Sequence, residues 1–335
     1  MDTFNNDILA QKVFGIHSKD DFKKVAFEVL RFQYTHNKIY RNYIDTLGIK
    51  PAQTARVEDI PFLPVSFFKT HKALCGEEDK NDIVFYSSAT ASGVASRHIV
   101  KNVSIYRQSF SRCFRHFYGD VTDYCILALL PSYLQRSGSS LVYMAEDMMK
   151  ESGNPHSGFY LHNMDELAAK ITLLEKAGQK TLLLGVTYAL LDFAEKYPAK
   201  LNHTIIMETG GMKGKRREMP REEVHSLLKN AFGTVAIHSE YGMTELLSQA
   251  YSKGGGVFYC PPWMQVVIRD VYDPLHTGLT ETGGAINIID LANINSCSFI
   301  ATDDAGIAHK DGSFEVSGRL DQSDIRGCNL MAEEL

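Results

Sequence analysis

The sequence of 335 residues is 44% hydrophobic and 22% charged, which is typical of a soluble globular protein with one large or two smaller α/β domains. Its formal net charge of −5 argues against nucleic acid as a partner. The six cysteines form no CxxC pair, so we expect neither a zinc site nor a disulfide framework, and a reducing compartment is favoured.

The N-terminal segment predicts helices and no targeting signal. It lacks the positive flank and apolar stretch of a secretory signal, and no apolar run approaches the ~20 residues that span a bilayer. Ser18 and Asp21 have capping-box spacing, and apolar residues follow on one helical face. We therefore expect a helical hairpin or a long helix up to Gly48, in a cytoplasmic protein with no membrane partner.

Two prolines shape the next segment, residues 60–65. They remove backbone donors, so this segment is predicted to be an extended, buried connector and not a central strand or a helix. A strand predicted at 82–86 then leads into a loop rich in Ser, Thr and Gly at 87–93. Small residues let backbone amides approach a phosphate, and hydroxyls add donors. A flexible polar loop is the alternative interpretation. The candidate phosphate-binding residues are Ser87, Ser88, Thr90, Ser92 and Gly93.

Helices and strands alternate between residues 165 and 237. Helices are predicted at 165–177, 188–197 and 220–232, and strands at 181–185, 203–208 and 234–237. This alternation predicts a largely parallel sheet with helices on its faces. Ligands of such sheets bind at the carboxyl ends of the strands, which is where Thr209, Gly210 and Gly211 fall.

The segment HSEYGMTELL, residues 238–247, is the centre of the predicted site. We expect a helix to begin at Leu246, so that YGMTE forms a strand-to-helix turn whose amides and helix dipole favour an anion. Thr244 adds a hydroxyl, whereas Glu245 would repel an anion unless a divalent cation lies between them. The pair therefore favours a magnesium nucleotide.

Strands dominate the sequence after the three glycines at 254–256. They are predicted at 257–259, 264–271, 285–290, 298–301 and 314–316. The predicted organisation has four parts. They are an N-terminal helical segment and connector at 1–80, an α/β nucleotide- and acyl-binding core at 81–256, a β-rich subdomain at 257–320, and a hinge and tail at 321–335.

YGMTE resembles the Tyr-Gly-x-Thr-Glu signature of the adenylate-forming (ANL) superfamily, whose members join a carboxylate to AMP. Three further patches occur in the same order as in that superfamily: the loop at 87–93, Thr302-Asp303-Asp304 with Gly306, and Gly318-Arg319-Leu320-Asp321. Within the superfamily, the chain is most similar to LuxE-like acyl-protein synthetases. The similarity is specific at residues 60–70, 87–98, 209–216 and 317–328.

This resemblance implies an ANL-type adenylating fold of the α/β class, with the patches around a single mononucleotide. It implies that residues 209–211 lie along the adenine, and that Tyr241 and Gly242 also bind the nucleotide. It also implies that Arg319 reaches the ribose or phosphate and that Glu245 holds Mg²⁺. Asp304 would hold the ribose hydroxyls, but Asp303 replaces the usual glycine, so the choice between the two aspartates stays open. A β-turn at these aspartates and a surface ion pair at Arg319 are the alternative interpretations.

The resemblance also implies that the small C-terminal domain of longer superfamily members is absent, with the lysine that helps the first half-reaction. Lys101, Lys213, Lys215 or a partner subunit remain alternative sources of that charge. Cys328 is the candidate nucleophile for the second half-reaction, because a thiolate attacks acyl-AMP and its thioester can be passed on. Arg326 would lower the pKa of that thiol. A small buried hydrophobic residue is the alternative role for Cys328.

The predicted function is that of an acid–thiol ligase. Using ATP and Mg²⁺, it would activate a fatty or related carboxylic acid, transfer the acyl group to Cys328, and pass it to an acyl reductase or carrier protein. Two alternatives remain open. One is a ligase that uses coenzyme A, in the manner of phenylacetate–CoA ligases. The other is a non-catalytic nucleotide-binding subunit of an acyl-transfer complex, for which Ala89, Ala91 and Asp303 argue because they depart from the superfamily pattern.

Overall fold

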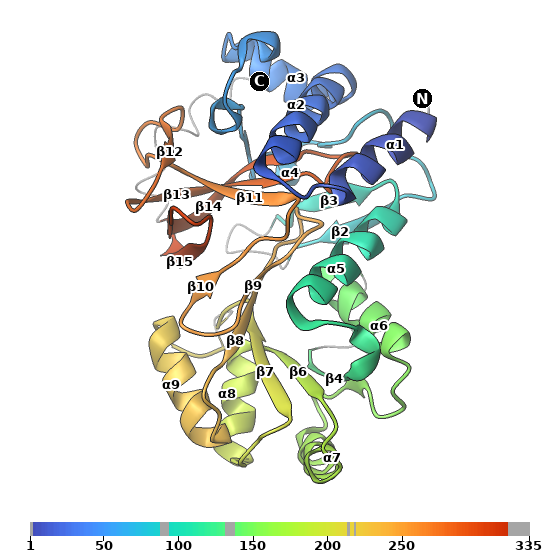
Figure 1. Cartoon of the computed structure of the whole chain (residues 1–335), viewed down its shortest axis with the longest axis vertical. Coiled ribbons are helices and arrows are strands. Elements are labelled where there is room, and N and C mark those ends of the chain that lie inside the picture. Colours follow the sequence, from blue (N-terminus) through green and yellow to red (C-terminus); the bar gives the residue numbers. More distant parts are fainter. Residues whose placement is uncertain (1–2, 88–93, 131–137, 213–214, 218, 321–335) are drawn as a thin grey trace. The chain divides into compact units, whose positions relative to one another are not determined.

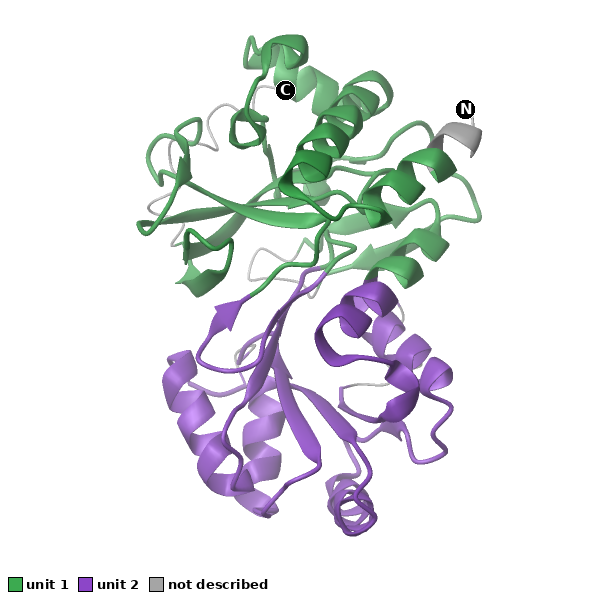
Figure 2. Cartoon of the chain, viewed as in Figure 1, with its two compact units in different colours: residues 1–109, 244–248, 259–335 green, residues 110–243, 249–258 purple. Residues whose placement is uncertain are grey.

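The computed structural model describes residues 3–87, 94–130, 138–212, 215–217 and 219–320. The chain divides into two compact units, which are coloured separately in Figure 2. Unit 1 comprises residues 1–109, 244–248 and 259–335, and unit 2 comprises residues 110–243 and 249–258.

Unit 2 contains a mainly parallel sheet with the strand order β5-β4-β6-β7-β8-β9. The strands are β4 (Cys125–Leu129), β5 (Gly158–Phe159), β6 (Thr181–Val186), β7 (Thr204–Thr209), β8 (His238–Tyr241) and β9 (Ala250–Ser252). Neighbours from β5 to β8 are parallel, whereas β8 and β9 are antiparallel. Every residue of β4 and β6 is buried, as is typical of parallel strands covered on both faces.

Helices connect these parallel strands (Figure 1). The helices of this part of the chain are α5 (Val103–Tyr118), α6 (Ser140–Ser152), α7 (Met164–Lys176), α8 (Thr187–Lys196) and α9 (Arg221–Phe232), with the 3-10 turn η3 (Val121–Asp123) and the short strand β10 (Val257–Phe258). Pro220 precedes α9, and Gly233 ends it with a φ of +58° that favours glycine. The predicted alternation of helix and strand is confirmed.

The last parallel strand begins later than predicted. Residues 234–237 form a loop, and β8 starts at His238. The prediction rested on the apolar character of this segment, but Val235 is 95% exposed. The left-handed turn at Gly233 places Val235 at the surface before the chain enters the sheet.

Unit 1 contains a mainly antiparallel sheet in which the strands follow the order β15-β14-β13-β11-β12. The strands are β11 (Met264–Arg269), β12 (Thr277–Leu279), β13 (Gly283–Asp290), β14 (Phe299–Ala308) and β15 (Phe314–Arg319). The predicted β-rich character is confirmed, and β12 is an addition that the sequence did not predict. The predicted connector does form an extended, buried segment. Its strand β1 (Leu63–Pro64) pairs in parallel with β14.

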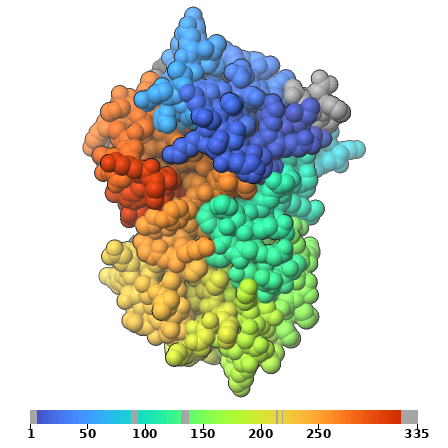
Figure 3. All heavy atoms as spheres, in the orientation of Figure 1, coloured from blue at the N-terminus to red at the C-terminus, as the bar shows by residue number. Residues whose placement is uncertain are grey.

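The N-terminal helices belong to the same unit. They are α1 (Thr3–Phe14), α2 (Lys19–His36), α3 (Lys38–Thr46) and the short α4 (Phe67–Thr70), with the 3-10 turns η1 (Pro51–Gln53) and η2 (Val57–Asp59). Ser18 caps α2 by accepting a hydrogen bond from the Asp21 amide, as predicted. Asn37 separates α2 from α3. Residues of α1 and α2, in blue, form a continuous surface of this unit in Figure 3.

The two units divide the chain differently from the four predicted segments. The predicted core at 81–256 contributes residues to both units, because the hairpin of β2 (Ile83–Tyr86) and β3 (Arg97–Val100) groups with unit 1. Residues 244–248 also group with unit 1. Contacts distant in sequence, which composition does not reveal, determine this grouping. Within the described part of the chain, we find no helix with the length and apolar character needed to cross a membrane.

The crowded glycine of β14 offers a test of the unit 1 sheet. A Cβ at Gly306 would lie 2.1 Å from the Glu315 carbonyl oxygen on β15, whereas a Cβ at Gly283 would meet nothing within 4 Å. We expect Gly306→Ala to lower the free energy of unfolding by about 2 kcal/mol or more, because the backbone must move. Gly283→Ala is the matched control, with an expected change within about 0.5 kcal/mol. Urea unfolding measures both, and equal effects would contradict this packing.

Candidate active site

The turn at residues 244–248 is not the start of a helix, so that prediction is wrong. After a turn at Thr244 and Glu245, the chain returns as β9. The amides that would begin a helix bond to a side chain instead. The Asp290 carboxylate accepts hydrogen bonds from the Leu247 amide at 2.7 Å, the Ser248 amide at 2.9 Å and the Ser248 hydroxyl at 2.6 Å. The helix-dipole argument therefore does not apply here.

Two more buried side chains hold the same turn through its carbonyl groups. Asn293 donates from Nδ2 to the Glu245 carbonyl oxygen at 2.7 Å and to the Cys297 carbonyl oxygen at 3.0 Å. His98 Nδ1 lies 2.7 Å from the Thr244 carbonyl oxygen, and its Nε2 lies 3.0 Å from Asn293 Oδ1. The backbone at Thr244 and Glu245 is thus fixed by residues from β3 and from the loop after β13.

Glu245 is a buried carboxylate with positive charges around it. Burial raises the pKa of its carboxyl, whereas a hydrogen bond from Ser96 and the charges of Lys69 and Arg319 oppose that rise. Within unit 1, two residues of the predicted site, Glu245 and Arg319, are therefore near enough for the charge of one to act on the other. It adds Lys69 of α4, which the sequence did not single out.

Asp304 and Arg319 face each other across β14 and β15. Arg319 Nε lies 3.8 Å from Asp304 Oδ1, and the arginine side chain is 73% exposed. An ion pair this long and this exposed adds little stability, which leaves the guanidinium able to bind a ligand anion. Asp303 and Asp304 both lie inside β14, so the alternative interpretation of a β-turn at these residues is wrong.

Strands β2 and β3, which flank the predicted loop at 87–93, pair antiparallel. Ser87 exchanges hydrogen bonds with Ser96, accepting from its amide through Oγ at 2.9 Å and donating its own amide to the Ser96 carbonyl oxygen at 3.1 Å. The predicted residues that lie outside the described part of the chain are Ser88, Ala89, Thr90, Ala91, Ser92, Gly93, Lys213, Asp321, Arg326 and Cys328. The rest of the predicted hinge and tail at 321–335 lies outside it as well.

Unit 2 places its predicted residues at the carboxyl ends of β7 and β8. Thr209 lies opposite Glu240 in the parallel register, and its hydroxyl donates to the Glu240 carboxyl. Gly210 has a φ of +69°, which favours glycine. A Cβ at Gly242 would lie 2.5 Å from Glu240 Oε1, so a side chain there would require this carboxyl to move.

The family model for the acyl-protein synthetase LuxE matches residues 14–335. The chain belongs to the LuxE acyl-protein synthetase family. A relative from Vibrio harveyi, the long-chain-fatty-acid–luciferin-component ligase, is 24% identical over 326 residues, which are 90% of this chain and 84% of the relative. The predicted family is therefore confirmed.

Solved structures confirm the predicted adenylate-forming fold. An open conformation of 2-hydroxyisobutyryl-CoA ligase, in complex with 2-HIB-AMP and CoA, has a TM-score of 0.66 at 12% identity, over 92% of this chain and 77% of that chain. ATP-bound MatB from Rhodopseudomonas palustris has a TM-score of 0.54 at 15% identity, over 70% of this chain. The LuxE-family chain spans 47% of the length of that MatB chain.

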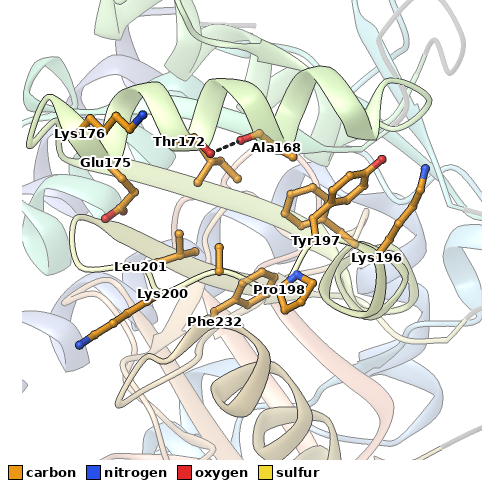
Figure 4. Close-up of a pocket in the computed structure, with 13 residues that line it drawn as sticks. Ala168, Thr172, Glu175, Lys176, Lys196, Tyr197, Pro198, Lys200, Leu201 and Phe232 are labelled. Carbon is orange, nitrogen blue, oxygen red and sulfur yellow. Dashed lines mark hydrogen bonds between the residues drawn. The ribbon is translucent and has the colours of Figure 1, made fainter.

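Unit 2 of this LuxE-family protein contains a cavity of about 490 Å³ (Figure 4). It is lined by α7, by α8 and by the segment from Tyr197 to Leu201, which precedes β7. This is the edge at which β7 begins, opposite to the carboxyl ends that bind ligands in parallel sheets. None of the predicted site residues lines it.

Sequence reasoning missed two acidic side chains at the carboxyl ends of the strands, Glu208 and Glu240. Burial raises the pKa of Glu240 to about 7; the bond from Thr209 opposes this rise, and the charge of Glu208 adds to it. Burial also acts to raise the pKa of Glu208, but hydrogen bonding by His225 and the charge of Arg221 hold it below its ordinary value. The available signal was that Glu208 ends a predicted strand and that Glu240 directly precedes the YGMTE turn.

The raised pKa of Glu240 predicts a pH-dependent stability. The folded state prefers the neutral carboxyl, so stability is lost as pH rises from about 4.5 to about 7 and is constant above that range. Glu240→Gln keeps an acceptor for Thr209 and removes the charge. We compare the free energy of unfolding of the variant with that of the wild type. This difference should be about 2 kcal/mol more favourable to the variant at pH 8 than at pH 5.

Urea unfolding at the two pH values measures this gain. Glu222→Gln, at an exposed position in the first turn of α9, is the control and should stay within about 0.5 kcal/mol of the wild type. A constant difference between wild type and Glu240→Gln from pH 5 to pH 8 would show that Glu240 is ionised throughout.

Proposed function

We propose that this protein activates a fatty or related carboxylic acid with ATP, forming acyl-AMP, and transfers the acyl group to a protein thiol. The observation that carries the proposal is the LuxE family match from residue 14 to residue 335, which includes all four motif patches. The Vibrio harveyi relative is named for long-chain fatty acid as its substrate, and we extend that substrate class to this chain.

The first half-reaction needs charge neutralisation more than proton transfer. A carboxylate oxygen of the acid bonds to the α-phosphorus of ATP, and the bond from that phosphorus to the β-phosphate oxygen breaks, releasing pyrophosphate. Both reactants are anions, so cations and hydrogen-bond donors must hold them together. In unit 1, the Thr244 hydroxyl, Arg319 and Lys69 supply such groups.

Lys69 joins the candidate sources of positive charge for the first half-reaction. Its charge acts on Glu245. Lys101 instead donates to the Glu77 carbonyl oxygen and lies 3.9 Å from Asp82. Lys215 is exposed.

Glu245 fits the role of a magnesium ligand. No cluster of three or more His, Cys, Asp or Glu side chains suited to a metal occurs among the described residues. Mg²⁺ that accompanies a nucleotide is commonly held by one or two carboxylates and the substrate phosphates. A single buried carboxylate such as Glu245 suits that arrangement, and the ion would supply charge stabilisation to the phosphates.

The remaining nucleotide contacts follow from the positions of the side chains. Asp304, 16% exposed and paired with Arg319, is proposed to accept hydrogen bonds from the ribose hydroxyls. In unit 2, the backbone of Thr209, Gly210 and Gly211, with Tyr241 and Gly242, is proposed to contact the adenine. A Cβ added at Gly211 would meet nothing within 4 Å, so the backbone there is open to a flat ring.

Cys328 is proposed as the acyl acceptor of the second half-reaction. Its thiolate sulfur would bond to the acyl carbon, and the bond from that carbon to the AMP oxygen would break. The described cysteines suit this role poorly: burial raises the thiol pKa of Cys75, Cys125, Cys260 and Cys297, and Cys113 is fully buried. From Cys328 the acyl group is proposed to pass to a reductase or carrier protein.

Two assays test the proposal. Acid-dependent exchange of pyrophosphate into ATP is expected with fatty acids and Mg²⁺, and chelation of the metal should abolish it. Incubation with ATP and fatty acid should add one acyl mass that hydroxylamine removes, and Cys328→Ser should lack this adduct while keeping exchange within about threefold of the wild type. An adduct that persists in Cys328→Ser contradicts the acceptor assignment. Acyl-CoA formed without an adduct would favour a coenzyme A ligase.

The two neighbouring aspartates of β14 allow a matched comparison. If Asp304 holds the ribose, Asp304→Asn should raise the KM for ATP by about tenfold or more, since a hydrogen bond to a charged group contributes about 1.5 to 3 kcal/mol. Asp303→Asn should change the KM by less than about threefold. If Asp303→Asn instead raises the KM for ATP more than Asp304→Asn does in pyrophosphate exchange, the ribose contact belongs to Asp303.

A further inference from the structure

The turn at residues 244–248 is held by three buried side chains that lie far from it in the sequence. They are His98, at the second position of β3, Asp290, at the end of β13, and Asn293, three residues later. Each contacts backbone atoms of the turn, and their exposed fractions are 1%, 0% and 1%. We refer to these three residues as the turn clamp.

We propose that His98 and Asn293 of the turn clamp are positioning residues for adenylation, because they fix the carbonyl groups of Thr244 and Glu245 and so orient those two side chains. This proposal rests on the proposed function, in which Thr244 and Glu245 act on the phosphates and Mg²⁺. It assigns His98 and Asn293 a role without contact to the substrate.

The contact pattern separates this role from ordinary core packing. Asn293 donates both protons of its amide to backbone carbonyls, at Glu245 and Cys297, which fixes its Oδ1 toward His98 Nε2. The two nitrogens of His98 therefore face two acceptors, Oδ1 of Asn293 and the Thr244 carbonyl oxygen. A side chain present only to fill space would not place a ring nitrogen within 3.0 Å of a polar partner on each of two sides.

The ring of His98 is constrained on its other side as well. Phe68 of α4 meets it edge to face with ring centroids 5.6 Å apart. Burial lowers the pKa of His98 to about 4, and the contacts with the Thr244 carbonyl and with Asn293 act to raise it.

Small displacements of catalytic groups have large effects on rate. A shift of about 1 Å, caused by a mutation that does not touch the substrate, can lower a rate by about a hundredfold. Loss of the turn clamp is therefore expected to lower the rate at saturating substrates more than it raises the KM for ATP.

Three variants test the proposal. His98→Leu removes both contacts of the ring, whereas His98→Asn places an amide nitrogen near the position of Nδ1 and keeps a donor for the Thr244 carbonyl. Tyr40→Phe is the stability control. It deletes a buried hydrogen bond of the same unit, from the Tyr40 hydroxyl to the Pro61 carbonyl oxygen at 2.6 Å, which lies outside the clamp.

We expect His98→Leu to lower pyrophosphate exchange at saturating ATP and fatty acid by about tenfold or more, with His98→Asn recovering to within about threefold of the wild type. Tyr40→Phe should stay within about twofold even though its melting temperature falls. The proposal is overturned if His98→Leu keeps its rate within about twofold, or if Tyr40→Phe loses as much activity at an equal loss of thermal stability.

Hydrogen exchange measured by mass spectrometry separates this proposal from the proposed function. Peptides that cover residues 241–249 should exchange about tenfold faster in His98→Leu than in the wild type, and those of Tyr40→Phe should not change. If the wild type shows no pyrophosphate exchange with any acid, the proposed function fails. The hydrogen-exchange result then still decides whether His98 fixes the turn, and unchanged protection of these peptides in His98→Leu overturns the clamp.

Discussion

The candidate site depends on the hydrogen bonds that the buried carboxylate of Asp290 accepts. A carboxylate removed from water is costly unless hydrogen bonds replace its hydration, and burial raises the pKa of Asp290 accordingly. The donors that oppose this rise are the amides of Leu247, Ser248 and Ala292 and the hydroxyl of Ser248. Three of these four donors belong to the turn. If the turn moved away, the carboxylate would stay in the core without these three donors.

The same segment ties the N-terminal helices of unit 1 to its sheet. The side chain of Gln33 in α2 donates to the carbonyl oxygens of Asn293 and Ile294 and accepts from the Ser298 amide. Asn37 donates to the Ser296 carbonyl oxygen, and Trp263, packed against Phe14 of α1, donates to the Ser248 hydroxyl. Residues 290–298 thus connect the helices, the sheet and the turn through polar contacts that all lie in the core. Replacing any one partner removes a hydrogen bond from a group that is buried away from water.

The sequence predicted the parts of the structure that local patterns determine. The helix cap at Ser18, the alternation around β6 and β7, and the β-rich character after residue 257 all follow from spacing and composition within short windows. The turn after β8 was predicted wrongly because Leu246 and Leu247 are good helix formers, while Asp290, more than 40 residues away, captures their amides. Local propensity cannot reveal such a partner. The roles of His98 and Asn293 were missed for the same reason, since each is a single polar residue whose contacts are distant in sequence.

The absence of a helix after Glu245 changes how this site would bind an anion. A helix N-terminus offers amide donors and a dipole without any side chain, but the Leu247 and Ser248 amides are already bonded to Asp290. Positive charge must therefore come from side chains and metal, and unit 1 supplies Lys69 and Arg319 near the carboxylate of Glu245. A buried carboxylate whose pKa is raised by burial becomes a better cation ligand when a metal arrives, because the ion stabilises its charged form. Under the proposed function, Glu245 would hold Mg²⁺ and the ion would hold the phosphates, which suits a site that takes its metal with the nucleotide.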